Sequence, residues 1–202
     1  MLMALRGAGI GDLGVLSAME RTPRDAFAAP EDSDRAWDDA PLPIAGGLGL
    51  WRPYVTAVLL GALEVGDRDR VLLAPTGTGY EAAVLSGLCR WVYTPEPSRD
   101  RRRAAEERLK ALGLKNVVTQ VGAPASGWPA QAPFDRIWLN EGMDEIPSAL
   151  MKQLRPGGVM VAVVGPDPAM RRVIRYQRSD DGMEHKTLLA LNAAVTAGAR
   201  PD

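Results

Sequence analysis

The 202-residue chain is predicted to fold as an α/β protein with a doubly wound, mostly parallel sheet. Short apolar segments of strand character alternate with helical segments from Val71 to Val164. A strand over 71–74 runs into a glycine turn and then a helix, which is the pattern of a parallel βαβ unit. The composition, 46% hydrophobic and 24% charged, is that of one globular domain with a substantial core.

Residues 1–40 are expected to form a small helical cap on this domain. Leu13, Leu16 and Met19 recur at helical spacing up to a break at Thr22-Pro23. The segment 41–53 is too rich in proline and glycine for a helix, so an irregular loop that lies over the site is expected there.

The rest of the chain, residues 54–195, is expected to form the core domain, followed by a frayed tail over 196–202. Strands and helices are assigned from apolar periodicity, proline and glycine breaks, and the helix cap Ser98. The predicted helices cover 54–63, 81–88, 98–112 and 147–154. The predicted strands cover 71–74, 91–94, 116–121, 134–139 and 159–164, with an antiparallel pair over 171–178 and 185–191 at the sheet edge.

The glycine turn Thr76-Gly77-Thr78-Gly79 is the first candidate site. Glycines allow a positive φ and let the backbone come close to a ligand, while the following helix directs free N–H groups and its positive dipole end into the turn. A nucleotide-like cofactor fits such a turn. Plain tight packing between a strand and a helix is the alternative, because a Gly-x-Gly pattern alone is weak.

Glu96 is the second candidate. It ends the apolar run 91–94 about 20 residues after the glycines, where doubly wound folds place an acid that binds ribose hydroxyls. An exposed loop acid is the alternative interpretation.

Charge and residue counts argue against several other functions. The chain has 24 lysines and arginines against 25 acids, so no net positive charge attracts nucleic acid, and the basic run 99–103 is interpreted as a solvated helix face. The single cysteine, Cys89, and the single histidine, His185, argue against a disulfide, a metal site and Ser/His/Asp chemistry. No apolar run reaches about 18 residues, so no membrane partner is expected. A cytoplasmic location is expected instead.

A set of motifs spread over residues 5–192 resembles the protein-L-isoaspartate O-methyltransferase family. The motifs lie at 19–27, 41–44, 53–54, 66–67, 71–72, 76–80, 82–85, 127–128, 132–137, 145–147, 154–158 and 181–182. The resemblance implies a seven-stranded Rossmann-like sheet, the class I methyltransferase fold. It also implies S-adenosylmethionine as cofactor and methyl transfer to the carboxylate of isoaspartyl residues in age-damaged proteins or peptides, a repair reaction.

The same resemblance implies roles for individual residues. The turn would wrap the methionine part of the cofactor, Glu96 would take the ribose hydroxyls, and the loop 42–52 would hold the substrate. The implied cofactor residues are Thr76, Gly77, Thr78, Gly79, Tyr80, Glu96, Gly122 and Ala123. The implied substrate residues are Leu42, Pro43, Ile44 and Trp51. No catalytic residue is assigned, because Trp51 stands where the family has a hydroxyl.

The chain also departs from the family pattern. Leu73 stands where the family has an acid, and Pro75 stands where it has a glycine. Ala123, which is followed by Pro124, replaces an Asp that contacts adenine in the family. In the substrate region Gly49 replaces a Thr, Trp51 the hydroxyl residue, and Asn192 an Arg. A lost charged hydrogen bond costs about 1.5–3 kcal/mol, so weak cofactor binding and impaired or shifted activity are expected.

Three functional hypotheses remain. The first is an active methyltransferase, whose chemistry needs positioning and water exclusion more than an acid or base. The second is a catalytically inactive binding protein with the methyltransferase fold. The third is a dehydrogenase in which Gly77-x-Gly79-x-x-Ala82 and Glu96 bind a nicotinamide cofactor, although no catalytic domain is evident.

Overall fold

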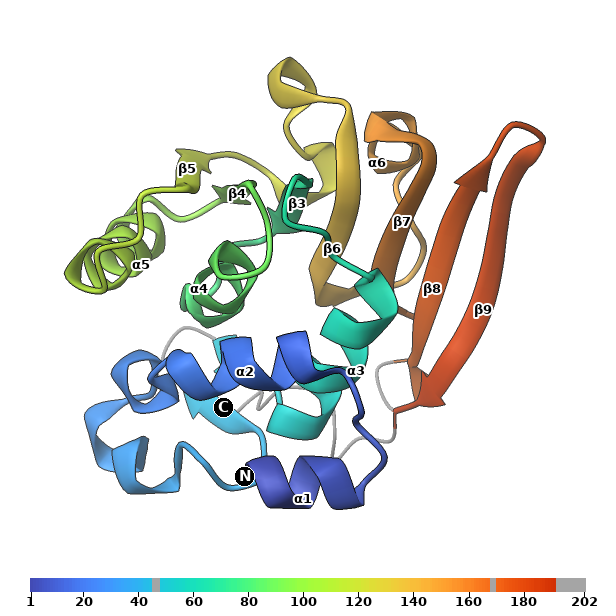
Figure 1. The fold of residues 1–202 in the computed structure, drawn as a ribbon. Coiled ribbons are helices and arrows are strands. Elements are labelled where there is room, and N and C mark those ends of the chain that lie inside the picture. The colour runs from blue at the N-terminus through green and yellow to red at the C-terminus, as the bar shows by residue number, and fades with distance from the viewer. Residues whose placement is uncertain (45–47, 168–169, 192–202) are drawn as a thin grey trace.

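The computed structural model describes residues 1–44, 48–167 and 170–191, so Asn192 and the predicted tail lie outside the described residues. A sheet of seven strands forms the centre, in the order β5-β4-β3-β6-β7-β8-β9 (Figure 1). From β3 to β7 neighbouring strands are parallel, and β8 and β9 continue the sheet antiparallel. The predicted fold class is therefore confirmed.

The order of the strands places the switch point of the sheet beside β3 (Arg70–Ala74). The chain moves outward through β4 (Trp91–Glu96) and β5 (Val117–Val121), then returns to the other side of β3 as β6 (Phe134–Met143). Ligands of open α/β sheets bind outside the carboxyl ends of the strands at such a reversal. The glycine turn directly follows the carboxyl end of β3.

Strand residues alternate between the two faces of the sheet. Val71 and Leu73 belong to one buried cluster with Trp138, while Leu72 and Ala74 belong to a second cluster with Leu139. The first cluster also takes in the side chains of the N-terminal helices and of α3 (Pro53–Leu63) and α4 (Tyr80–Ser86). The second packs under α6 (Ser148–Gln153). Both faces of the central strands are therefore covered, as their continuous apolar sequences require.

The helices and edge strands agree with the predicted elements, with shifted ends. The helix α5 (Arg99–Ala111) begins after Ser98, whose side chain accepts a hydrogen bond from Arg101 N as an N-cap. The helix α3 ends at Glu64 in a left-handed conformation, two residues before the expected glycine. The strands β7 (Leu154–Val164), β8 (Arg172–Ser179) and β9 (Gly182–Ala190) complete the sheet.

The segment 41–53 is not the irregular loop that its composition predicts. Its backbone forms a two-stranded antiparallel hairpin from β1 (Leu42–Ile44) and β2 (Leu48–Leu50). Leu42 and Leu50 pair in register and are both fully buried, so burial of alternate side chains stabilises the hairpin despite the glycines. The prediction of irregular structure here was wrong.

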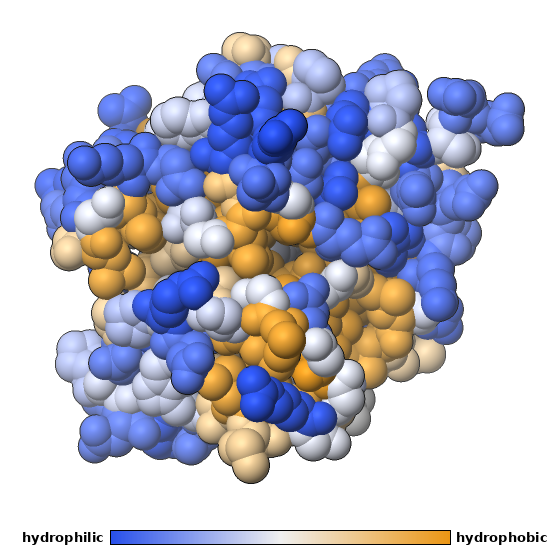
Figure 2. All heavy atoms as spheres, in the orientation of Figure 1, coloured by the Kyte–Doolittle hydropathy of each residue, from blue (hydrophilic) through white to orange (hydrophobic). Residues whose placement is uncertain are grey.

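The N-terminal residues form helices, as predicted: α1 (Leu2–Gly7), α2 (Leu13–Arg21) and the short 3₁₀ helices η1 (Arg24–Phe27) and η2 (Pro30–Arg35). They lie below the sheet near α3 and α4 in Figure 1. In Figure 2 hydrophobic side chains gather across the middle of this view, between the N-terminal helices and the sheet. No helix in the described part of the chain is long and apolar enough to cross a membrane.

Candidate functional site

The glycine turn has the backbone that its sequence predicts. Gly77 and Gly79 have φ values of 60° and 95°, which a side chain would strain. The turn is fastened to β4, because Thr76 N donates to Pro95 O at 3.1 Å and the Thr94 hydroxyl donates to Thr76 Oγ1 at 2.8 Å. These hydrogen bonds therefore hold the turn in place at the carboxyl edge of the sheet.

Glu96 lies directly against the glycine turn. Its side chain is fully buried, and its Oε2 accepts a hydrogen bond from Gly77 N at 3.2 Å. The other oxygen, Oε1, accepts from Ser98 N at 3.3 Å and from Arg101 Nε at 2.8 Å. The predicted proximity of Glu96 to the glycines is confirmed, and the alternative of an exposed loop acid was wrong.

Arg101 corrects one detail of the sequence analysis. The basic run 99–103 does include exposed side chains, but Arg101 turns inward and its side chain is only 33% exposed in its ion pair with Glu96. The interpretation as a solvated helix face therefore fails for this residue. Its spacing from Glu96, five residues across a helix N-terminus, is the signal that was missed.

The residues present fit the ribose end of an adenosyl cofactor. A carboxylate oxygen accepts more than one hydrogen bond, so Glu96 Oε2 can bind Gly77 N and a ribose hydroxyl together. Glu141 is a second carboxyl group near Glu96. Partial burial and the negative charge of Glu96 raise the pKa of the Glu141 carboxyl group. Carboxylates here favour a ligand that carries a positive charge, such as a sulfonium.

The part of the site where the adenine is expected, around Gly122 and Ala123, is less polar than the part around Glu96. Gly122 is placed by a hydrogen bond from its N–H to Glu96 O at 3.1 Å, and Ala123 beside it is exposed. A Cβ built on Gly122 would lie 3.4 Å from Gln120 Nε2. The Gln120 amide therefore lies beside Gly122, a neighbour that the sequence analysis did not identify.

Trp51 follows β2 and contacts Asn140, which lies near the glycine turn. Its side chain is buried, and its indole Nε1 donates to Asn140 Oδ1 at 2.9 Å. Asn140 Nδ2 lies 3.4 Å from Glu81 Oε2, 3.5 Å from Pro75 O and 3.6 Å from a Cβ built on Gly77. The buried indole therefore fills space beside Asn140, next to the turn.

Sequence reasoning missed Asn140 and Glu81. The predicted strand stopped at residue 139, whereas β6 continues to Met143 and brings Asn140 to the carboxyl edge beside β3. Glu81 follows the turn on α4, where an acid in the first helical turn looks like an ordinary dipole partner. Its complete burial could not be read from the sequence.

Buried charge surrounds this cluster. Arg24 is fully buried and donates to the backbone oxygens of Ala36 and Trp51, and its guanidinium lies 4.8 Å from the centre of the Tyr80 ring. Burial raises the pKa of Tyr80 to about 12 and raises the pKa of Glu81 above its ordinary value, although Arg24 opposes both shifts. The Tyr80 ring packs against Phe27 and so contributes to the core.

The expected substrate residues are only partly brought together. Trp51 lies at the turn, while the Leu42 side chain is fully buried in the core. The side chains of Pro43 and Ile44 lie outside what the structure describes.

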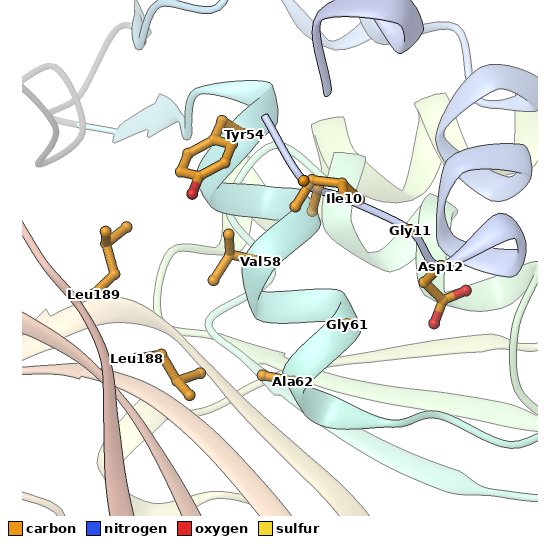
Figure 3. Close-up of a pocket in the computed structure, with 11 residues that line it drawn as sticks. Ile10, Gly11, Asp12, Tyr54, Val58, Gly61, Ala62, Leu188 and Leu189 are labelled. Carbon is orange, nitrogen blue, oxygen red and sulfur yellow. The ribbon is translucent and has the colours of Figure 1, made fainter. Parts of the chain in front are cut away.

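A separate groove of about 370 Å³ lies along α3 (Figure 3). Tyr54 and Val58 of α3 face Leu188 and Leu189 of β9 across it, and Asp12 lies at the other end. Asp12 Oδ1 caps α2 by accepting from Val15 N at 3.0 Å. This groove has the apolar lining of a small-ligand site but no group that directs a reaction.

Comparison with known proteins decides the family. Residues 1–198 match the family model described as protein-L-isoaspartate(D-aspartate) O-methyltransferase. The chain belongs to this family. A protein-L-isoaspartate O-methyltransferase from Paracoccus denitrificans is 45% identical over 187 residues, which are 93% of this chain and 87% of the relative. Another from Dinoroseobacter shibae is 42% identical over 202 residues, which are 100% and 94% of the two chains.

Solved structures of the protein-L-isoaspartate O-methyltransferase family share the fold. One has a TM-score of 0.83 at 24% identity and covers 98% of this chain and 65% of its own. A Plasmodium falciparum protein, solved with S-adenosyl-L-homocysteine, has a TM-score of 0.80 at 17% identity and covers 98% and 97% of the two chains. Membership of this family replaces the dehydrogenase hypothesis, because the glycine turn and Glu96 are accounted for without a nicotinamide cofactor.

Proposed function

We propose that the protein transfers a methyl group from S-adenosylmethionine to the free carboxylate of an isoaspartyl residue. The observation that supports this proposal is the hydrogen bond between Gly77 N and the buried Glu96 carboxylate, which brings together the glycine turn and the acid that we assign to the ribose end of an adenosyl site. Relatives that bear the isoaspartate methyltransferase name at 42–45% identity support the choice of reaction.

The protein's residues would act by binding and orienting. The sulfonium of the cofactor supplies an activated methyl group. A carboxylate oxygen of the substrate forms the new C–O bond, the S–CH₃ bond breaks with its electron pair going to sulfur, and no proton moves. A carboxylate is ionised at pH 7, so no catalytic His or Cys is needed. We assign Thr76 to Tyr80 and Glu96 to holding the cofactor.

The acceptor side of the site is formed by the hairpin and the end of β6. Trp51 reaches this point from β2, and Asn140 meets it from β6. We assign substrate contact to Trp51 and to the hairpin residues Pro43 and Ile44. Leu42, which the resemblance also implies, is left out because its side chain is fully buried in the core. Because an indole lacks an acceptor and fills space beside the turn, methylation is expected to be slow compared with a site that carries a hydroxyl here.

The partner that fits this chemistry is a protein or peptide with an isoaspartyl residue. The balanced charge of the chain, 24 bases against 25 acids, supports a protein substrate over a nucleic acid. We infer a cytoplasmic location for this reaction.

The test is transfer of label from methyl-labelled S-adenosylmethionine to two peptides that differ only in an isoaspartyl or an aspartyl linkage. The proposal expects label in the isoaspartyl peptide at a low rate and none above background in the aspartyl peptide. Cofactor binding without transfer to either peptide would contradict it and would favour a binding protein with this fold. Equal labelling of both peptides would contradict the assigned substrate.

A further inference from the structure

We propose that Asn140 binds the carboxylate of the methyl acceptor and that the Trp51 indole occupies this position as an internal gate. The inference rests on the proposed function and goes beyond it, because it names the residue that receives the acceptor and the side chain that must move first. Its basis is the chain of contacts from Trp51 through Asn140 to Glu81.

The location of Asn140 fits an acceptor-binding residue. It stands at the carboxyl end of β6, beside β3 at the switch point of the sheet. Its Nδ2 is 3.6 Å from a Cβ built on Gly77, so an acceptor at Asn140 would lie against the glycine turn. The described residue that occupies the Asn140 amide oxygen is Trp51, which is 4% exposed, so an acceptor that binds Asn140 must displace the indole.

The indole also fixes which way the Asn140 amide points. An indole N–H is only a donor, so the atom 2.9 Å from Trp51 Nε1 must be the amide oxygen. The Nδ2 group then faces the acceptors Glu81 Oε2 and Pro75 O, at 3.4 and 3.5 Å. With Trp51 in place, Asn140 presents an acceptor to the site and would repel a carboxylate.

Departure of the indole would reverse this arrangement. Rotation of the amide by half a turn would present Nδ2 to the acceptor carboxylate and turn Oδ1 toward Glu81. That orientation gives up the contact with Pro75 O, at 3.5 Å, and gains a hydrogen bond when Glu81 donates a proton. The Glu81 carboxyl group is fully buried, with Oε1 lacking a partner among the described residues. The groups that face Glu81 are Arg24 and Tyr80, and the raised pKa of Glu81 supports a protonated form.

Two variants separate the gate from the acceptor contact. Trp51→Phe keeps an aromatic ring but removes the N–H, which frees the Asn140 amide, so KM for the isoaspartyl peptide should fall at least threefold. Asn140→Asp keeps an oxygen for the indole but removes the donor and adds a negative charge, so KM should rise at least tenfold. Trp91→Phe is the matched control, because Trp91 begins β4, at the end of the strand away from Glu96. This variant should leave KM for the isoaspartyl peptide unchanged.

A second readout does not depend on turnover. The chain has five tryptophans, so ¹⁵N-tryptophan labelling gives five indole N–H signals, and Trp51→Phe identifies one of them. Titration with the isoaspartyl peptide in the presence of S-adenosylhomocysteine should move the Trp51 signal and leave the other four in place. The aspartyl peptide should leave all five in place.

The outcomes distinguish this inference from the proposed function. Wild-type methylation with an unmoved Trp51 signal, or with unchanged KM in both variants, would overturn the gate alone. A wild type without methylation and an active Trp51→Phe variant would overturn the proposed function of the native chain and support the gate. Inactivity of both proteins, with no peptide-induced change in any indole signal, would overturn both.

Discussion

Replacement of Glu96 by glutamine removes one charge from the centre of the candidate cofactor site with little change of shape. In the wild type three donors, Gly77 N, Ser98 N and Arg101 Nε, share the two carboxylate oxygens. Glutamine retains one oxygen and places an NH₂ group at the other. One orientation sets this NH₂ against Gly77 N, and the other sets it against Ser98 N and Arg101.

The expected cost follows from these contacts. A hydrogen bond to a charged group contributes about 1.5–3 kcal/mol. The Arg101 side chain is 33% exposed, so water compensates part of the loss, and we expect the free energy of unfolding to fall by about 2 kcal/mol. A ribose hydroxyl would lose its charged acceptor as well, which corresponds to roughly tenfold weaker cofactor binding.

Urea denaturation measures the first effect, and the thermal shift at graded concentrations of S-adenosylhomocysteine measures the second. The control is Glu107→Gln on the same helix, where the ion pair with Arg103 spans 3.8 Å and both side chains are more than 70% exposed. That change should alter stability by less than about 0.5 kcal/mol. Indistinguishable behaviour of the two variants in both assays would refute the role given to Glu96.

Three further predictions concern Glu81, Cys89 and Ser98. Burial raises the pKa of Glu81 in the fold, so its contribution to the free energy of unfolding is present below the unfolded pKa and is lost as pH rises through the folded pKa. The stability of Glu81→Gln relative to wild type, measured by urea denaturation, should therefore increase from pH 5 to pH 8. An equal difference between the two proteins at both pH values would contradict this. Burial and the negative charge of Asp69 raise the pKa of Cys89 to about 12. An aromatic disulfide reagent at pH 8 should therefore modify one thiol per chain in urea and almost none in the native protein. Rapid reaction of the native protein would contradict the assigned burial. Ser98→Ala removes the side chain that caps α5 at Arg101 N and should cost about 1 kcal/mol in urea denaturation, a loss that Ser98→Asp should largely avoid.

Local sequence signals predicted most of the fold. Apolar runs of four to six residues, broken by glycine and proline, placed the parallel strands, and Ser98 marked the start of α5. The hairpin at 42–50 was missed because glycine and proline lower strand propensity, while the burial that stabilises the pair Leu42 and Leu50 depends on distant parts of the chain.

The candidate site was predictable in the same local sense. The glycine turn and Glu96 lie on neighbouring strands, so spacing along the chain indicated their proximity. The contact of Trp51 with Asn140 joins residues 89 positions apart, and no spacing rule predicts it. The burial of Arg24 and Glu81 beside this contact likewise arises from tertiary packing of the N-terminal helices and hairpin.

The central claim is that the glycine turn and Glu96 form a working adenosyl site in spite of the substitutions at Leu73, Pro75 and Ala123. Calorimetric titration of the wild-type protein with S-adenosylhomocysteine tests it most directly. We expect one ligand per chain with a Kd of roughly tens of micromolar or weaker, because the turn and the ribose acceptor remain while adenine contacts are reduced. Absence of binding heat, together with an unchanged melting temperature at millimolar ligand, would contradict the account.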